Sequence, residues 1–230
     1  LETAAEAAAK GVVDSEPMPH IFSCYPDVAL KIDALGKLVD LREYFSQEEL
    51  SKYVADFLSD GTFEDDRQLL IPIAKSTELL FINDTDWQAF SKASGYTDQD
   101  LETWESICEV SKSYYEWTDQ QTPNKHWDGK AMLGFDSVAN YIIVSNRQMG
   151  LEVIHSNLDG TGKVVLNENI MRKIFDIYFP QNVLGYFGSY GEFRADDVKQ
   201  GDLISYVASS SGASYFPTRV TDGSSLSEVE

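Results

Sequence analysis

The chain has 230 residues, of which 43% are hydrophobic and 12% aromatic, which is enough for one large domain or two lobes of ordinary size. Its formal net charge of −20 argues strongly against a nucleic-acid partner, because a nucleic-acid backbone needs a basic face. The same charge disfavours docking on anionic lipid. No apolar run of the sequence approaches the ~20 residues that span a bilayer.

Cysteine and histidine usage indicates no metal site. Cys24 and Cys108 are far apart and lack metal-ligand spacing, and the 3 histidines are scattered along the chain. Two buried thiols are the default interpretation, with a single disulfide as the alternative. We therefore expect no metal and no other cofactor.

Two short stretches come close to catalytic signatures but depart from them. Residues 212–216 begin like the turn that carries a nucleophilic serine, but Phe216 replaces its second glycine. Residues 160–163 end like a phosphate-binding loop, but Val164 replaces the Ser or Thr that would hold magnesium. The sequence therefore predicts a protein that is not an enzyme.

Caps, turns and the spacing of apolar residues predict helices and strands that alternate. In chain order they are a helix over 1–10, a strand over 20–24, helices over 28–35 and 46–58, strands over 69–74 and 78–82, helices over 87–93, 103–117 and 136–147, short strands beside a turn at 157–162, a helix over 167–178 and a strand over 203–207. The polar tail from Thr221 is expected to fray. The alternation indicates an α/β architecture.

Small polar residues follow three of the predicted strands. Tyr25 and Asp27 follow the strand over 20–24, residues 75–77 follow the next strand, and residues 209–212 follow the last. In an open α/β sheet such strand ends converge on the ligand crevice. Hydroxyls, a carboxylate, an ammonium group and nearby aromatics suit a sugar, a polyol or a phosphorylated small molecule. The alternative interpretation is that each stretch is only a turn or a flexible linker.

Four stretches carry a resemblance to a known family. They read PHIFSCYPDVALKIDALGKLVDLREYF, LLIPIAKSTELLFINDTDW, TWESICEVSKSYYEWTD and GDLISYVASSSGASYFP. Their order resembles that of extracellular solute-binding proteins of bacterial ABC transporters, in the family that includes maltose- and glycerol-3-phosphate-binding proteins. The resemblance covers nearly the whole chain. It implies a two-lobed, periplasmic-binding-protein-like α/β fold with an interlobe ligand cleft and a hinge.

The same resemblance implies how the chain is divided and where it is found. Lobe I would comprise residues 1–78 and 209–230, and lobe II residues 79–208. Relative to the family the chain is truncated at both ends, so we expect lobe I to be incomplete. We expect a monomeric extracellular or periplasmic protein, anchored to the membrane as a lipoprotein by a leader absent from this chain.

The resemblance also implies which residues contact the ligand. They are Cys24, Tyr25 and Asp27 in the first lobe, Lys75, Ser76 and Thr77 at the first crossover, Ser209, Ser210, Ser211, Gly212, Ser214 and Tyr215 at the second crossover, and Trp117, Asn140 and Tyr141 in the second lobe.

The implied function is capture of a small polar solute, such as a sugar, a polyol or a glycerophosphate, for delivery to the membrane permease subunits of an ABC importer. Lys75 and the serines leave room for an anionic ligand, because ammonium, N–H and O–H donors suit phosphate oxygens. A ligand-sensing or protein-interaction module of the same fold is the alternative. A hydrolase that uses Ser214 is a distant third.

Overall fold

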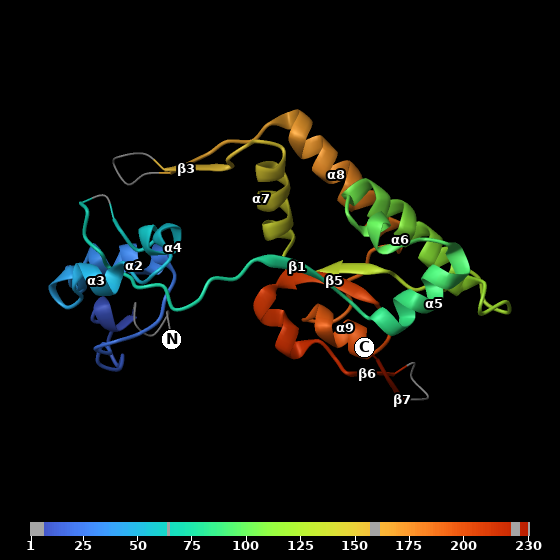
Figure 1. Cartoon of the computed structure of the whole chain (residues 1–230), viewed down its shortest axis with the longest axis horizontal. Coiled ribbons are helices and arrows are strands. Elements are labelled where there is room, and N and C mark those ends of the chain that lie inside the picture. Colours follow the sequence, from blue (N-terminus) through green and yellow to red (C-terminus); the bar gives the residue numbers. More distant parts are fainter. Residues whose placement is uncertain (1–6, 64, 157–161, 222–225, 230) are drawn as a thin grey trace. The chain divides into compact units, whose positions relative to one another are not determined.

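The computed structural model of the chain describes residues 7–63, 65–156, 162–221 and 226–229 (Figure 1). Its internal contacts divide it into two compact units, Leu1–Lys75 and Ser76–Glu230. The boundaries of these units differ from those of the predicted lobes, which are residues 1–78 plus 209–230 for lobe I and residues 79–208 for lobe II. The division into these lobes stays a prediction.

The first unit is built from short helices around a small core. Its elements are α2 (Pro26–Asp33), η1 (Leu41–Glu43), α3 (Gln47–Leu50) and α4 (Ala55–Ser59). Val28 and Ile32 lie one turn apart on α2, so they face the same side, and both are buried with Ala9. Polar contacts supplement this core: the Arg67 guanidinium donates to both carboxylate oxygens of Asp33, at 2.9 and 2.7 Å.

Three predictions of secondary structure in the first unit are wrong. Residues 20–24 are not a strand; no described segment pairs with them, and Ile21 is 92% exposed. Residues 69–74 are extended, but the described pairing in this region is one bridge between Thr62 and Gln68. Pro72, which has no N–H to donate, accounts for part of this.

The third of these predictions is the single helix over 46–58. The predicted capping box is present, because Glu49 N–H donates to Ser46 Oγ and Ser46 N–H to the Glu49 carboxylate. The helix nevertheless ends at Leu50, after one turn. A second helix, α4, begins only after Val54, whose ψ of 123° is extended.

The second unit contains a three-stranded sheet in the order β1 (Glu78–Ile82), β5 (Ser205–Ser209), β2 (Leu133–Phe135). The central strand β5 runs antiparallel to β1 and parallel to β2. Side chains alternate along β5: Val207 packs in one hydrophobic cluster, whereas Tyr206 and Ala208 pack in another. The predicted buried strand is therefore confirmed, but it begins at Ser205.

Helices and two hairpins complete this unit. They are α5 (Asp84–Ser94), η2 (Asp98–Leu101), α6 (Trp104–Asp119), α7 (Val138–Gln148), α8 (Glu168–Val183), α9 (Arg194–Lys199), η3 (Ser210–Tyr215) and the strand pairs β3 (Ile154–Ser156) with β4 (Gly162–Val164) and β6 (Arg219–Thr221) with β7 (Leu226–Glu228). The side chains of Thr103 and Asn167 cap α6 and α8, as the sequence predicts.

Two predictions concern these hairpins. The short strands predicted beside the turn are present as β3 and β4, whereas the predicted turn itself falls on residues 157–161, which lie outside the described part. The tail beyond Thr221 does not fray throughout, because β7 pairs with β6 and Val229 N–H donates to Thr218 O at 3.0 Å. Residues 222–225 and 230 lie outside the described part of the chain.

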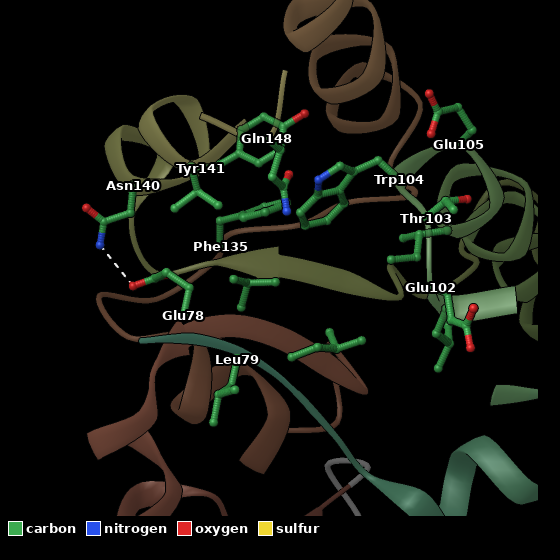
Figure 2. Close-up of a pocket in the computed structure, with 15 residues that line it drawn as sticks. Glu78, Leu79, Glu102, Thr103, Trp104, Glu105, Phe135, Asn140, Tyr141 and Gln148 are labelled. Atoms are coloured by element: carbon green, nitrogen blue, oxygen red, sulfur yellow. Dashed lines mark hydrogen bonds between the residues drawn. The ribbon is translucent and has the colours of Figure 1, made fainter. Parts of the chain in front are cut away.

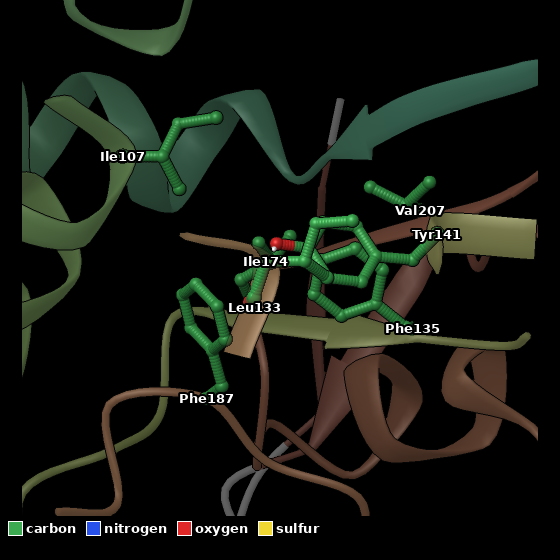
Figure 3. Packing of buried hydrophobic residues seen from close by; sticks show 7 residues of the cluster. All are labelled: Ile107, Leu133, Phe135, Tyr141, Ile174, Phe187 and Val207. Carbon is green, nitrogen blue, oxygen red and sulfur yellow. Dashed lines mark hydrogen bonds between the residues drawn. The ribbon is translucent and has the colours of Figure 1, made fainter. Parts of the chain in front are cut away.

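The core places helices against both faces of the sheet. Figure 3 shows the cluster in which Ile107 of α6, Tyr141 of α7 and Ile174 of α8 gather on Phe135 and Val207 of the sheet. A second cluster joins α5 to α6, and a third packs α9 and β6 on the other face of β5. The second unit is thus a mixed α/β structure, which agrees with the predicted class.

Candidate functional site

The second unit contains a cavity of about 420 Å³ between the sheet and the first turns of α6 and α7 (Figure 2). Its floor is aromatic. Phe135 at the end of β2 and Tyr141 in the first turns of α7 are buried, with ring centroids 4.8 Å apart. Trp104, the first residue of α6, is half-buried and lies 5.5 Å from Phe135 and 5.2 Å from Tyr141.

Local sequence explains why these rings meet. Thr103 and Ser137 cap the two helices, since each side-chain oxygen accepts a backbone N–H three residues later. The caps therefore start α6 at Trp104 and place Tyr141 one turn beyond Ser137. Leu80 of β1 and Val207 of β5 line the same floor from the sheet.

The rim of the cavity is acidic. Glu78 begins β1, Glu102 follows the last residue of η2 as its C-cap, and Glu105 lies in the first turn of α6. Asn140 Nδ2 donates a hydrogen bond to Glu78 Oε1 over 2.9 Å. The described residues that line the cavity include no Lys, Arg or His. The cavity therefore has an apolar floor and a negatively charged rim.

Tyr141 presents its ring to the cavity while its hydroxyl is held in the core. The hydroxyl donates to Ile174 O at 3.3 Å. Burial raises the pKa of Tyr141 well above its usual range. The phenol is therefore neutral at ordinary pH and contributes an apolar surface with an electron-rich face.

Two of the predicted ligand residues of the first unit form ion pairs within that unit. Lys75 forms an ion pair with Asp60 and lies 5.9 Å from the centre of the Phe57 ring. Asp27 lies 3.8 Å from Lys31, one turn along α2, and the pair is well exposed. The two other candidates here are Cys24, half-buried beside the small core, and Tyr25, 72% exposed before α2. Their roles in ligand binding stay predictions.

The structure brings the two predicted crossovers together where they belong to the second unit. Ser210 N–H donates to Thr77 O at 2.7 Å, and Thr77 N–H donates to Ser210 Oγ at 3.3 Å. Ser76, next to this contact, is exposed. Two hydrogen bonds thus fasten the start of β1 to the end of β5.

Most hydroxyls of the serine-rich stretch are engaged locally. Ser209 and Ser211 share a hydrogen bond of 2.9 Å between their Oγ atoms, and Ser214 Oγ donates to Ser211 O at 3.1 Å. Gly212 lies against Phe81, where an added Cβ would be 3.6 Å from the ring, and Tyr215 is 75% exposed. The stretch is a 3-10 helix, η3, and its contact with a ligand stays a prediction.

Among the second-unit candidates, Asn140 and Tyr141 line the cavity. Trp117 lies elsewhere, 5.5 Å from Phe90 in the cluster between α5 and α6. Sequence reasoning missed the most prominent members of the cavity. They are Trp104, Phe135, Glu78, Glu102 and Glu105. The available signal was the pair of glutamates on either side of Thr103-Trp104 at the start of a helix.

Neither a membrane-spanning helix nor a metal site is found in the described part of the chain. None of the described helices is long and apolar enough to cross a membrane. Within the described ranges, no three His, Cys, Asp or Glu side chains gather closely enough to hold a metal ion. Neither cysteine is in a disulfide there.

Comparison with known proteins bears on the fold. No protein-family model and no curated protein matches the sequence. Among solved structures, the chain is similar to UgpB from Mycobacterium tuberculosis, crystallised in complex with glycerophosphocholine. The TM-score is 0.68 at 20% identity, over 90% of this chain and 50% of UgpB. The fold is periplasmic-binding-protein-like. The chain thus spans about half the length of UgpB. The expected fold is confirmed at this coarse level, and the two lobes and the hinge stay predictions.

Proposed function

We propose that the chain is part of the solute-binding component of an ABC importer, which captures a small polar solute and delivers it to a membrane permease. The observation that carries the proposal is the fold match to UgpB over 90% of the chain, since UgpB was crystallised with a small polar ligand, glycerophosphocholine. The amphipathic cavity on the second unit supports it, because an apolar floor with polar groups at its edge is typical of ligand sites.

The proposal includes two lobes that close on the solute by a hinge, in an extracellular or periplasmic protein anchored by a leader. The paired crossovers support a hinge: the backbone enters β1 beside the point where it leaves β5, at Thr77 and Ser210. Neighbouring crossovers let few residues absorb the change in backbone angles when lobes close. The solute is bound and released unchanged.

Thermal unfolding with and without ligand tests this function. Glycerophosphocholine, glycerol 3-phosphate, maltose and glycerol each would be added to the full chain, with isothermal titration calorimetry for any ligand that raises the unfolding temperature. A ligand at 100 times its dissociation constant stabilises the folded state by about 2.7 kcal/mol. We expect saturable binding of at least one member of this panel. No binding of any of them would contradict the proposal.

A further inference from the structure

The three glutamates on the rim of the cavity have no basic partner within the described part of the chain. None of Glu78, Glu102 and Glu105 forms an ion pair with a described Lys or Arg, and no basic side chain lines the cavity. Elsewhere in the chain exposed carboxylates do find such partners, for example Glu152 with Arg147 at 2.8 Å. These unpaired carboxylates therefore favour a ligand that carries a positive charge.

The aromatic floor also favours a positively charged ligand. Trp104, Phe135 and Tyr141 contact one another at centroid distances of 4.8 to 5.5 Å, so their π systems lie together beneath the rim (Figure 2). The face of an aromatic ring attracts a cation, and Trp does so most strongly. Leu80 and Val207 add methyl groups that suit an alkylated cation better than a hydrated metal ion.

The charges also discriminate against anions. A phosphate placed in the cavity would meet carboxylates on its rim without an Arg or Lys to neutralise it. On the rim the Asn140 amide donates to Glu78 Oε1 at 2.9 Å, and Thr103 Oγ1 shares a hydrogen bond of 2.8 Å with Ser106 Oγ. Two polar groups of the rim are thus already hydrogen-bonded within the protein.

From these observations we propose that the cavity between β1, α6 and α7 binds the alkylammonium group of an organic cation. The floor of Trp104, Phe135 and Tyr141 receives the alkyl groups, and the rim carboxylates neutralise the charge. The inference rests on the proposed function, since it names the chemical class of solute that this unit recognises. For this cavity, the proposal excludes the anionic ligand that the sequence analysis left open.

Calorimetric titration of the full chain with tetramethylammonium chloride and choline chloride tests the inference, with inorganic phosphate and glycerol 3-phosphate as anionic probes. We expect saturable binding of both cations, weaker at 0.5 M than at 0.05 M NaCl because the rim charges are partly screened. Inorganic phosphate should not bind in the cavity.

Charge-neutralising variants locate the site. Glu102→Gln and Glu105→Gln should each weaken choline binding about two- to fivefold, as loss of one exposed charge contact does, and the double variant more strongly. Glu109→Gln is the matched control, because it removes one exposed charge from α6 outside the cavity lining. Trp104→Leu should weaken binding of tetramethylammonium as well. Trp104→Phe keeps an aromatic face if the leucine variant fails to fold.

The outcomes separate this inference from the function on which it rests. Binding of glycerol 3-phosphate, maltose or glycerol without binding of either cation would overturn the ammonium site and leave the solute-binding function standing. Binding of choline that is reduced equally by Glu109→Gln and Glu105→Gln would overturn the assignment to this cavity. No binding of any probe would contradict both proposals.

Discussion

Asn140 Nδ2 donates a 2.9 Å hydrogen bond to Glu78 Oε1 and so joins the first turn of α7 to the start of β1, 62 residues earlier in the chain. The contact holds one rim carboxylate at the edge of the cavity in Figure 2. It also lies one residue beyond Thr77, where the chain is hydrogen-bonded to the end of β5. The cavity and the paired crossovers are therefore neighbours along β1.

Asn140→Asp is expected to destabilise the second unit more than Asn140→Ala. The alanine variant loses one exposed hydrogen bond, at a cost under about 1 kcal/mol. The aspartate variant also sets two carboxylates against each other, which brings the loss at pH 7 to about 1–2 kcal/mol. Urea unfolding followed by tryptophan fluorescence reports this unit, since all 4 tryptophans lie in it. An aspartate deficit that persists when both carboxyls are protonated would contradict the repulsion.

Local signals in the sequence predicted the starts of several helices correctly. Thr103 and Asn167 accept backbone N–H groups two or three residues further on, so the signal and the structure it makes lie within one turn. The strand over 20–24 failed for the opposite reason. Its apolar and aromatic residues suit a strand, but a strand needs a pairing partner, and the choice of partner is not encoded locally.

The cavity was only partly predictable for the same reason. Glu78, Trp104 and Tyr141 come from three elements that are distant in the chain and meet only after the helices pack on the sheet. Trp104 packs on Phe135 in the core and also lines the cavity. The Trp104 ring belongs to both the core and the cavity only because of how the helices pack on the sheet. The spacing of residues along the sequence does not predict this double role.

Asp197→Ala is expected to cost about 3–5 kcal/mol, because it leaves a buried guanidinium unpaired. Arg194 Nη1 lies 2.9 Å from Asp197 Oδ2, and the two side chains are 3% and 1% exposed. Asp197 also accepts the backbone N–H groups of Tyr190 and Gly191, at 3.1 and 2.7 Å. Urea unfolding followed by tryptophan fluorescence gives the free energy.

A surface ion pair provides the matched control for that experiment. Arg147 and Glu152 lie 2.8 Å apart, but their side chains are 65% and 51% exposed. Glu152→Ala should therefore change the free energy of unfolding by less than about 1 kcal/mol. If Glu152→Ala and Asp197→Ala lowered the free energy of unfolding equally, burial of the Arg194–Asp197 pair would not explain the loss.

Asp40→Asn is expected to loosen the first unit at neutral pH but not in acid. The Arg42 side chain holds the pKa of Asp40 well below its ordinary value of 3.8, and backbone N–H groups of Arg42 and Gln68 add to this. A carboxyl whose pKa is lower in the folded state stabilises it above the unfolded pKa, and the contribution is lost as pH falls towards the folded pKa.

Hydrogen exchange of the segment 38–70 measures this effect. Above about pH 5 the variant should exchange faster than the natural chain, and the difference should shrink steadily as pH falls below 3.8. A difference that is independent of pH would mean that the Asp40 charge is not responsible.

Cys108 is expected to react slowly with iodoacetamide in the folded chain. Burial in α6 raises the pKa of its thiol to about 11, and the nearby carboxylates of Glu105 and Glu109 contribute in the same direction. The thiolate is the reactive form, so a rise of two pH units in the pKa slows labelling about a hundredfold at pH 8 relative to the unfolded chain. Mass spectrometry of the Cys108 peptide gives the rate. The rate should climb about tenfold per pH unit from pH 7 to 10, and Glu105→Gln should raise it at each pH. Labelling of folded and unfolded chains at the same rate would show that the thiol is not protected in this way.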